Sequence, residues 1–390
     1  MKLKEIGLYI HIPFCKQKCN YCDFCSYENK EQLIPKYMKW LQTEIREVGK
    51  SNEQDAKEGK DILFIVKTIY IGGGTPSFVD SMYIVEILKA IRESYNVDEK
   101  AEITIEVNPG TVTLKKLQDY FNCGINRLSI GLQSTYDTLL KQIGRIHTYQ
   151  EFLDTYHLAR EIGFQNINVD LMLGLPNQTL QEMQNSVEEV IGLEPEHISL
   201  YSLIVEEGTK LEKQLTEKVL VLPEELIERE MYWKTKELLE VNGYIHYEIS
   251  NFAKPDYASK HNMDCWNQKE YIGFGVASHS YTNGVRYSNV ENIEEYIQNY
   301  ENGKPEDNFI FHEKQNQEAK QKEFMMLGLR KIHGISVQEF KNRFIANPIY
   351  LYHKELEKLV TEELIEIDGD QIKLTNKGLD LANLVWEEFV

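Results

Sequence analysis

Residues 6–25, IGLYIHIPFCKQKCNYCDFC, decide how the rest of the chain is interpreted. Residues 6–12 are rich in β-branched and aromatic side chains and read as a strand. Cys15, Cys19 and Cys22 follow directly, so they lie on the loop at the carboxyl end of that strand. Three thiolates at these spacings can hold three corners of a [4Fe–4S] cluster and leave the fourth iron without a protein ligand. The motif therefore predicts an open cluster at a strand end.

The number of cysteines supports metal or redox chemistry. Six cysteines among 390 residues are too few for a disulfide scaffold, and four of them lie between residues 15 and 25. In a reducing compartment such a group indicates metal binding or redox activity. Zinc is the alternative, but zinc usually pairs C-x-x-C with a second couple of ligands. Cys123 and Cys265 stand alone and form no such couple.

Composition excludes several classes of protein. The chain has 43 Lys or Arg and 62 Asp or Glu, for a formal net charge of −19. An acidic surface repels phosphate backbones, so we expect no nucleic-acid partner. No run reaches the roughly 18 apolar residues that a membrane span needs, and the first residues lead into a strand without a cleavage site. We expect a cytoplasmic protein.

Strand-like and helical segments alternate through the first half of the chain, a pattern that predicts a parallel sheet with helices outside. The expected strands cover 6–12, 66–71, 102–107, 126–132, 167–173 and 197–204, and the expected helices cover 31–49, 80–94, 113–122, 135–162 and 178–192. Six units fit either a partial (β/α)6 barrel or an open doubly wound sheet. In both, a ligand lies at the carboxyl ends of the strands.

A second domain of α+β type is expected at the C-terminus, because charge is dense over 299–322 and Gly303-Lys304-Pro305 interrupts any helix there. Beyond it come helices near 318–332, 336–345 and 350–360, a hairpin at 364–375 with an Asp-Gly turn, and a last helix from about 376. This order resembles a winged helix. Winged helices often bind DNA, but residues 301–390 hold 12 Lys or Arg against 17 Asp or Glu, which favours a structural or partner-docking role.

The expected domains are therefore three. Residues 1–250 form the barrel, residues 251–300 form an extension rich in aromatic and histidine side chains, and residues 301–390 form the winged-helix-like domain.

The stretch from Tyr9 to Phe24, Y-I-H-I-P-F-C-x-x-x-C-x-Y-C-D-F, resembles the radical S-adenosylmethionine (SAM) superfamily. It is most similar to the branch related to the oxygen-independent coproporphyrinogen III oxidases, and the resemblance extends over nearly the whole chain. It implies a partial (β/α)6 barrel and a [4Fe–4S] cluster on the three cysteines. It also implies that the amino and carboxylate groups of SAM chelate the open iron.

The second expected strand ends in Gly72-Gly73-Gly74-Thr75-Pro76. Glycines let a backbone approach a ligand closely and expose its N–H and C=O groups. An ordinary strand-to-helix turn is the alternative. The family uses this motif at the SAM amino group, so the resemblance favours a binding role.

Later strand ends each place one polar residue in an apolar context, which is costly unless a ligand or partner satisfies it. For Glu106 and Asp170 the alternative is an internal salt bridge with Arg127 or Arg145. By resemblance the SAM-contacting positions are Tyr9, Tyr21, Gly73, Gly74, Thr75, Glu106, Gln133, Arg145 and Asp170, and Ile204 packs near the adenine.

Residues 244–289 combine many aromatic and histidine side chains, which suits either a large flat ligand or a packed aromatic core. His261-Asn262-x-x-Cys265-Trp266 resembles the H-N-x-x-Y-W motif of the HemW haem chaperones, a branch of the same family. The resemblance implies that His261 is an axial haem ligand. Cys265 replaces the motif tyrosine and, on a helix, would share a face with His261, so its thiolate could also reach iron. A buried, hydrogen-bonded histidine is the alternative.

Three functions remain open. The first is a haem chaperone that carries a SAM-ligated cluster, lacks coproporphyrinogen oxidase activity and hands haem to an acceptor protein of unknown identity, which can bring the chain into peripheral contact with a membrane. The second is a true oxidase that converts propionates to vinyl groups, and the third is a radical enzyme with an unrelated substrate. The chaperone is favoured because Cys15 lies near the start of the chain, Phe24 replaces the extra cysteine of the oxidases, and Cys25 does not restore it.

Overall fold

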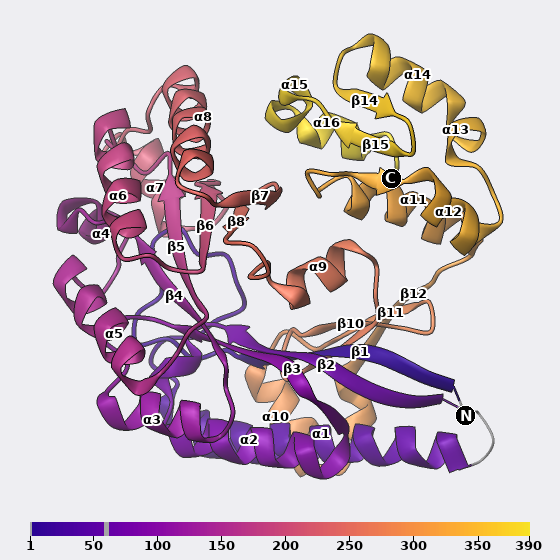
Figure 1. The fold of residues 1–390 in the computed structure, drawn as a ribbon. Helices are drawn as coiled ribbons and strands as arrows, with labels where there is room; N and C mark the ends of the chain where they lie inside the picture. The colour runs from indigo at the N-terminus through magenta and orange to yellow at the C-terminus, as the bar shows by residue number, and fades with distance from the viewer. Residues whose placement is uncertain (1, 58–61) are drawn as a thin grey trace.

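The computed structural model describes residues 2–57 and 62–390, and within them one 12-stranded sheet runs through the molecule (Figure 1). Its central strands, β1 to β6, are neighbours in chain order and all parallel. They are β1 (Lys2–Ile12), β2 (Ile62–Gly73), β3 (Asn96–Val107), β4 (Arg127–Gln133), β5 (Ile167–Leu173) and β6 (His197–Ser202). The six expected strands are confirmed, as is the partial (β/α)6 barrel.

Helices cover the outer side of the parallel strands, as Figure 1 shows for α1 to α6. The helices up to residue 241 are α1 (Ile34–Lys57), α2 (Ser81–Ser94), α3 (Leu114–Asn122), α4 (Asp137–Gln142), α5 (Tyr149–Ile162), α6 (Leu180–Gly192), α7 (Lys210–Thr216) and α8 (Glu225–Val241). Several begin at a threonine N-cap: Thr148 and Thr179 each form a capping box with a glutamate three residues later.

The single helix expected over 135–162 is wrong, because the segment forms α4 and α5 instead. Gly144 lies between them with φ +76°, a backbone conformation that ends the first helix. Thr148 then caps the second. The connection between the two helices carries Arg145, a residue of the functional site described below.

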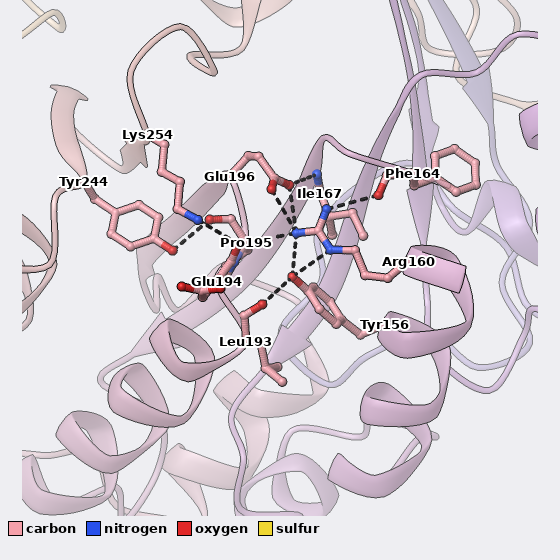
Figure 2. A network of polar contacts seen from close by, with 10 residues as sticks. All are labelled: Tyr156, Arg160, Phe164, Ile167, Leu193, Glu194, Pro195, Glu196, Tyr244 and Lys254. Atoms are coloured by element: carbon pink, nitrogen blue, oxygen red, sulfur yellow. Dashed lines mark hydrogen bonds and ion pairs between the residues drawn. The ribbon is translucent and has the colours of Figure 1, made fainter. Parts of the chain in front are cut away.

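A polar network closes the amino ends of β5 and β6 (Figure 2). Arg160 pairs with Glu196 at 2.9 Å, and Glu196 also accepts the backbone N–H of Ile167 at 3.0 Å. The hydroxyl of Tyr156 accepts from Arg160 and donates to the carbonyl of Leu193. These bonds tie α5 to the sheet at the edge away from the strands' carboxyl ends, where the functional side chains gather.

Residues 245–314 extend the same sheet on both sides of the parallel strands. The added elements are β7 (Ile245–Glu248), β8 (Asn251–Ala253), β9 (Tyr271–Phe274), β10 (His279–Thr282), β11 (Val285–Asn289) and β12 (Phe309–Lys314), with α9 (Lys260–Trp266) and α10 (Ile293–Glu301) between them. Strand β8 pairs with β6, and β9 pairs in parallel with β1. The segment expected as an extension therefore takes part in the main sheet.

The C-terminal region has a hydrophobic core of its own, around Phe324, Phe340, Leu356, Ile372 and Val385. It contains α11 (Gln317–Gly328), α12 (Val337–Phe344), α13 (Pro348–Leu351), α14 (His353–Thr361), α15 (Asn376–Asp380) and α16 (Ala382–Glu387), with a small antiparallel sheet of β13 (Ile335–Ser336), β15 (Gln371–Leu374) and β14 (Ile365–Asp368). The helices followed by a hairpin match the expected winged-helix-like order. The domain boundaries themselves stay a prediction.

Helix α9 lies between the sheet and this C-terminal region (Figure 1). The guanidinium of Arg330 stands 4.5 Å from the ring centroid of Trp266, the last residue of α9, and 4.3 Å from that of Trp386. Cation–π contacts of this kind are worth about 0.5–2 kcal/mol each. They hold α9 against the C-terminal helices. No helix in the described part of the chain has both the length and the apolar composition to cross a membrane.

Candidate functional site

A cavity of about 470 Å³ opens at the carboxyl ends of the parallel strands. It brings together residues from the cysteine loop, the glycine turn and the ends of β3 to β6. Of the expected site residues it is lined by Cys15, Cys19, Cys22, Tyr21, Gly73, Gly74, Thr75, Glu106, Gln133, Arg145, Asp170 and Ile204. One pocket thus collects side chains that are spread over almost 200 positions of sequence.

The cysteine loop is held by backbone bonds to its surroundings. The N–H of Cys15 donates to the carbonyl of Tyr27 at 2.9 Å, and the N–H of Asn20 donates to the carbonyl of Ile143 at 2.9 Å. The side chain of Asn20 donates to the Gln142 carbonyl at 2.8 Å. These bonds set the loop over the strand ends and aim its thiols into the cavity.

The thiols of Cys15, Cys19 and Cys22 are buried or half-buried and lie near a cation. Within the described residues, no group of three or more His, Cys, Asp and Glu side chains is placed to hold a metal ion. Burial raises the pKa of the Cys15 and Cys22 thiols, so their ionised forms need positive charge close by. Bound irons would supply that charge, and the guanidinium of Arg145 already stands 3.6 Å from the sulfur of Cys19.

The glycine turn brings its backbone against an acidic side chain. The N–H of Gly73 donates to Glu106 at 3.2 Å, and the hydroxyl of Tyr70 donates to the other carboxylate oxygen at 2.9 Å. Gly73 has φ +117°, and a Cβ there would lie 2.8 Å from the ring of His11. A Cβ on Gly74 would lie 3.0 Å from the sulfur of Cys15. The backbone of the turn therefore approaches the side chains of the site closely.

Three residues that line the cavity carry buried polar atoms without a hydrogen bond in the described part of the chain. Buried atoms without a hydrogen bond include Oε1 of Gln133, Nε of Arg145 and Oδ1 of Asn108. Each such atom costs about 1–3 kcal/mol unless something satisfies it. Gln133 also has φ +74°, a strained conformation for a residue with a side chain. Unsatisfied polar atoms and backbone strain therefore coincide at residues of the cavity wall.

The salt-bridge alternative for Glu106 and Asp170 is wrong. None of the ion pairs formed among residues 2–57 and 62–390 includes either carboxylate. Burial raises the pKa of Glu106 to about 7 and raises that of Asp170, while the charges of Arg127 and Arg145 lower the pKa of Asp170. Both acids accept hydrogen bonds, and neither is neutralised by an ion pair within the described residues.

Four residues at or near the cavity refine the expected arrangement. Tyr9 does not line the cavity: its ring lies 6.3 Å from that of Tyr70, and its hydroxyl bonds Nδ1 of His11 at 3.0 Å. Ile204 lies on the rim with 66% of its surface exposed. Tyr70 and Tyr201 line the cavity and were missed from the sequence. Strand alternation places Tyr70 on the same face as Gly72, and this was the available signal.

The expected haem ligands, His261 and Cys265, lie four residues apart on helix α9. His261 is buried; its Nδ1 bonds the Thr68 hydroxyl at 2.9 Å, and its ring stacks on that of Tyr70 at 5.3 Å. Burial, together with the charge of Arg127, lowers the pKa of His261 to about 4, so the imidazole is neutral. Burial and the charge of Asp264 raise the pKa of Cys265 to about 12.

The contacts of His261 and Trp266 show which parts of the structure the motif packs against. His261 bonds Thr68 of β2 and stacks on Tyr70, which lines the cavity. The indole of Trp266 is covered by Arg330. Much of the segment 244–289 is strand, paired within the main sheet. In this conformation the motif is packed against the barrel, and His261 matches the description of a buried, hydrogen-bonded histidine.

Comparison with known proteins places the fold and the motifs in one family. The family sequence model of the Radical SAM superfamily matches residues 9–190. The family sequence model of the HemN C-terminal domain matches residues 316–381. The heme chaperone HemW of Lactococcus lactis is 35% identical over 100% of this chain and 98% of its own length. That of Bacillus subtilis is 37% identical over 98% of each.

Among solved structures, the coproporphyrinogen III oxidase HemN from Escherichia coli, a radical SAM enzyme, aligns with a TM-score of 0.82. The alignment covers 99% of this chain and 90% of that one, at 21% sequence identity. At this identity the likeness concerns the fold, which includes the C-terminal region as well as the barrel.

Proposed function

Because the chain belongs to the radical SAM superfamily and, within it, to the family of the heme chaperone HemW, we propose that it binds haem, carries a SAM-ligated [4Fe–4S] cluster and passes the haem to an acceptor protein. The observation that carries the proposal is similarity over the full length to two heme chaperones, at 35% and 37% identity. The exposed side chain of Phe24 on the cavity wall, where the oxidases have an additional cysteine, agrees with it.

Cys15, Cys19 and Cys22 would hold the cluster, and the cavity would hold SAM. A bound cluster supplies an iron that chelates SAM and can pass it an electron. The protein itself would position SAM. The glycine turn offers backbone groups to it, and Glu106 and Asp170 offer negative charge to its sulfonium group. Gln133 and Arg145 add polar side chains to the cavity wall.

Binding of SAM should depend on pH through Glu106. The pKa of this carboxyl is raised to about 7 in the free protein, so it is protonated below pH 7 and charged above it. A cationic ligand favours the charged form, and we expect SAM affinity to fall as pH decreases from 8 to 6, by up to about tenfold per unit below pH 7. Calorimetry across this range checks the slope. Glu106→Gln should bind SAM more weakly with a flat profile, and a wild-type profile that is equally flat would contradict the role of Glu106.

Haem is proposed to bind at His261, with Cys265 as a second candidate ligand. In the packed conformation the His261 ring is covered by Thr68 and Tyr70, so ligation requires α9 to move away from β2. The cost includes one side-chain hydrogen bond, of about 1 kcal/mol, and the loss of ring stacking. Coordination by a neutral imidazole offsets this cost.

The test is haem titration of the reconstituted protein. We expect His261→Ala to shift the Soret band or lower haem affinity, while cluster iron stays unchanged because its ligands come from a different part of the chain. His157→Ala, which removes an exposed histidine on α5, is the matched control. Unaltered haem binding in the His261 variant would remove the ligand assignment. Conversion of coproporphyrinogen III by the anaerobic wild-type protein would favour the oxidase instead.

The acceptor is proposed to be a haem-requiring protein, reached in the cytoplasm or at a membrane surface. The C-terminal region is the proposed docking element for it, since residues 301–390 carry more acidic than basic side chains.

A further inference from the structure

A second cavity, of about 960 Å³, lies between the main sheet and the C-terminal region. Its wall is formed by the start of β1, the connection from α9 to β9, the hairpin of β10 and β11, and the helices α11 and α12. The volume lies within the range of about 300–1,000 Å³ that is usual for small-molecule sites. None of the cluster and SAM residues named above lines it, so it is separate from the SAM cavity.

The charge of this second cavity is opposite to that of the protein as a whole. The complete chain has a formal net charge of −19. The charged side chains of the cavity wall are four basic and two acidic ones: Lys4, Lys269, Lys320 and Arg343, with Glu5 and Glu270. A local excess of positive charge concentrates anions at that place.

Internal ion pairs account for two of these basic side chains and for both acids. The ammonium of Lys4 lies 2.6 Å from a carboxylate oxygen of Glu270, and that of Lys269 lies 3.5 Å from one of Glu5. No ion pair formed among residues 2–57 and 62–390 includes either of the other two basic side chains. The excess positive charge of the cavity therefore resides on those two.

Lys320 and Arg343 are these two cations, and their neighbours do not neutralise them. Arg343 donates to the carbonyls of Asn267 and Gln268, both at 3.1 Å, and to the Gln268 side chain at 2.9 Å. These bonds fix the guanidinium at the wall and leave two of its five N–H groups for a ligand. The ammonium of Lys320 lies beside Gly284, where a Cβ would come within 2.5 Å of it.

Apolar surface adjoins these cations. Tyr281, Phe344 and Ile345 line the same cavity, and Ile345 is 94% exposed. The guanidinium of Arg343 lies 5.4 Å from the ring centroid of Phe344. A ligand that matches this wall carries negative groups on an apolar body. Haem has this chemistry, because its propionates project from a flat apolar ring.

We propose that this cavity binds haem through its propionates, with Lys320 and Arg343 as their partners. The inference rests on the proposed function, in which haem is the cargo, and it requires neither ligation by His261 nor movement of α9. Hydrogen bonds between a cationic donor and a carboxylate are roughly twice as strong as neutral ones, and a guanidinium can offer two of them in parallel. Among the described lining residues, Tyr281 is the one side chain of a type that ligates haem iron, so recognition falls mainly to the carboxylates.

Iron-free protoporphyrin IX separates contacts to the propionates from ligation of iron. It keeps the ring and both propionates and has no metal for a histidine. We expect the protein loaded with cluster and SAM to bind it in a fluorescence titration, and the binding to weaken as salt rises, because salt screens exposed charges. The dimethyl ester of protoporphyrin IX has the same ring without the negative charges, and it should bind about tenfold more weakly.

Lys320→Glu tests the protein side of the same contact. Reversing this charge should lower the affinity for protoporphyrin IX about fivefold, and the affinity for haem by a similar factor. Lys354→Glu makes the same change at an exposed lysine of α14 that lines neither cavity, and it should bind as the wild type does. Thermal unfolding checks that both variants are folded.

The outcomes separate this inference from the proposed function. Equal binding of protoporphyrin IX and its dimethyl ester would overturn the inference, as would wild-type affinity in Lys320→Glu. Binding of haem without any binding of protoporphyrin IX would also overturn it, and would leave the proposed function standing on iron ligation. Absence of haem binding in the wild type would overturn the proposed function and this inference with it.

Discussion

Replacing Cys19 with alanine is expected to abolish the cluster. The three thiols line one end of the cavity and the loop offers one sulfur for each of three irons, so no spare ligand is in place. Iron content should fall from about four per chain to near zero, and the broad visible absorption should disappear. Cys15→Ala and Cys22→Ala should behave in the same way.

Three other cysteines serve as matched controls. Cys25 lies on the same loop but outside the cavity lining, with its sulfur 3.3 Å from the Glu291 carbonyl, and Cys123 and Cys265 lie on other elements. Alanine at any of the three should leave iron content intact. Retention of the visible spectrum in Cys19→Ala, or loss of iron in Cys25→Ala, would refute the assignment of cluster ligands.

Gly73→Val is the second change with a large expected effect. The backbone of Gly73 has φ +117°, which costs a β-branched residue on the order of 1–3 kcal/mol, and the new Cβ would meet the His11 ring at 2.8 Å. Relief of that contact moves the Gly73 N–H away from Glu106. We expect SAM affinity to fall by at least tenfold, about 1.4 kcal/mol, while the cluster is retained.

Gly192→Ala is the control for this change, because a Cβ at Gly192, the last residue of α6, meets nothing within 4 Å. Calorimetry gives SAM affinity and thermal unfolding checks that the variant is folded. If the folded Gly73 variant bound SAM as the wild type does, residues 72–76 would be a turn without a binding role.

The parallel strands and most outer helices could be predicted because their determinants are local. Alternation of β-branched residues, threonine caps and the spacing of three cysteines are all written in short segments. The helix expected over 135–162 failed for a local reason as well: Gly144 takes φ +76°, and its effect outweighs the amphipathic pattern around it. The polar residues at strand ends met in one cavity because parallel strands share a carboxyl edge.

The contacts of the segment His261–Trp266 could not be predicted from local patterns, because they join parts of the chain that are far apart in sequence. Tyr70 was overlooked because, read alone, an aromatic residue in a strand usually packs in a core. Only the approach of α9, some 190 positions later in the chain, places a histidine on its ring. Tyr9 was expected at the ligand, but its ring packs beside that of Tyr70 and it does not line the cavity.

The amino-acid sequence by itself determined the parallel strand-and-helix units, the short loop with three cysteines and the polar residues at the strand ends, since residue spacing and periodicity depend on near neighbours. The choice of a partial barrel over an open sheet came from the family resemblance. Only the tertiary structure decided that His261 is buried on β2, that Trp266 is covered by Arg330, and that Tyr70 bridges histidine and cavity. Burial and stacking depend on which distant segments pack together, and that is set by the free energy of the whole core rather than by any one stretch of chain.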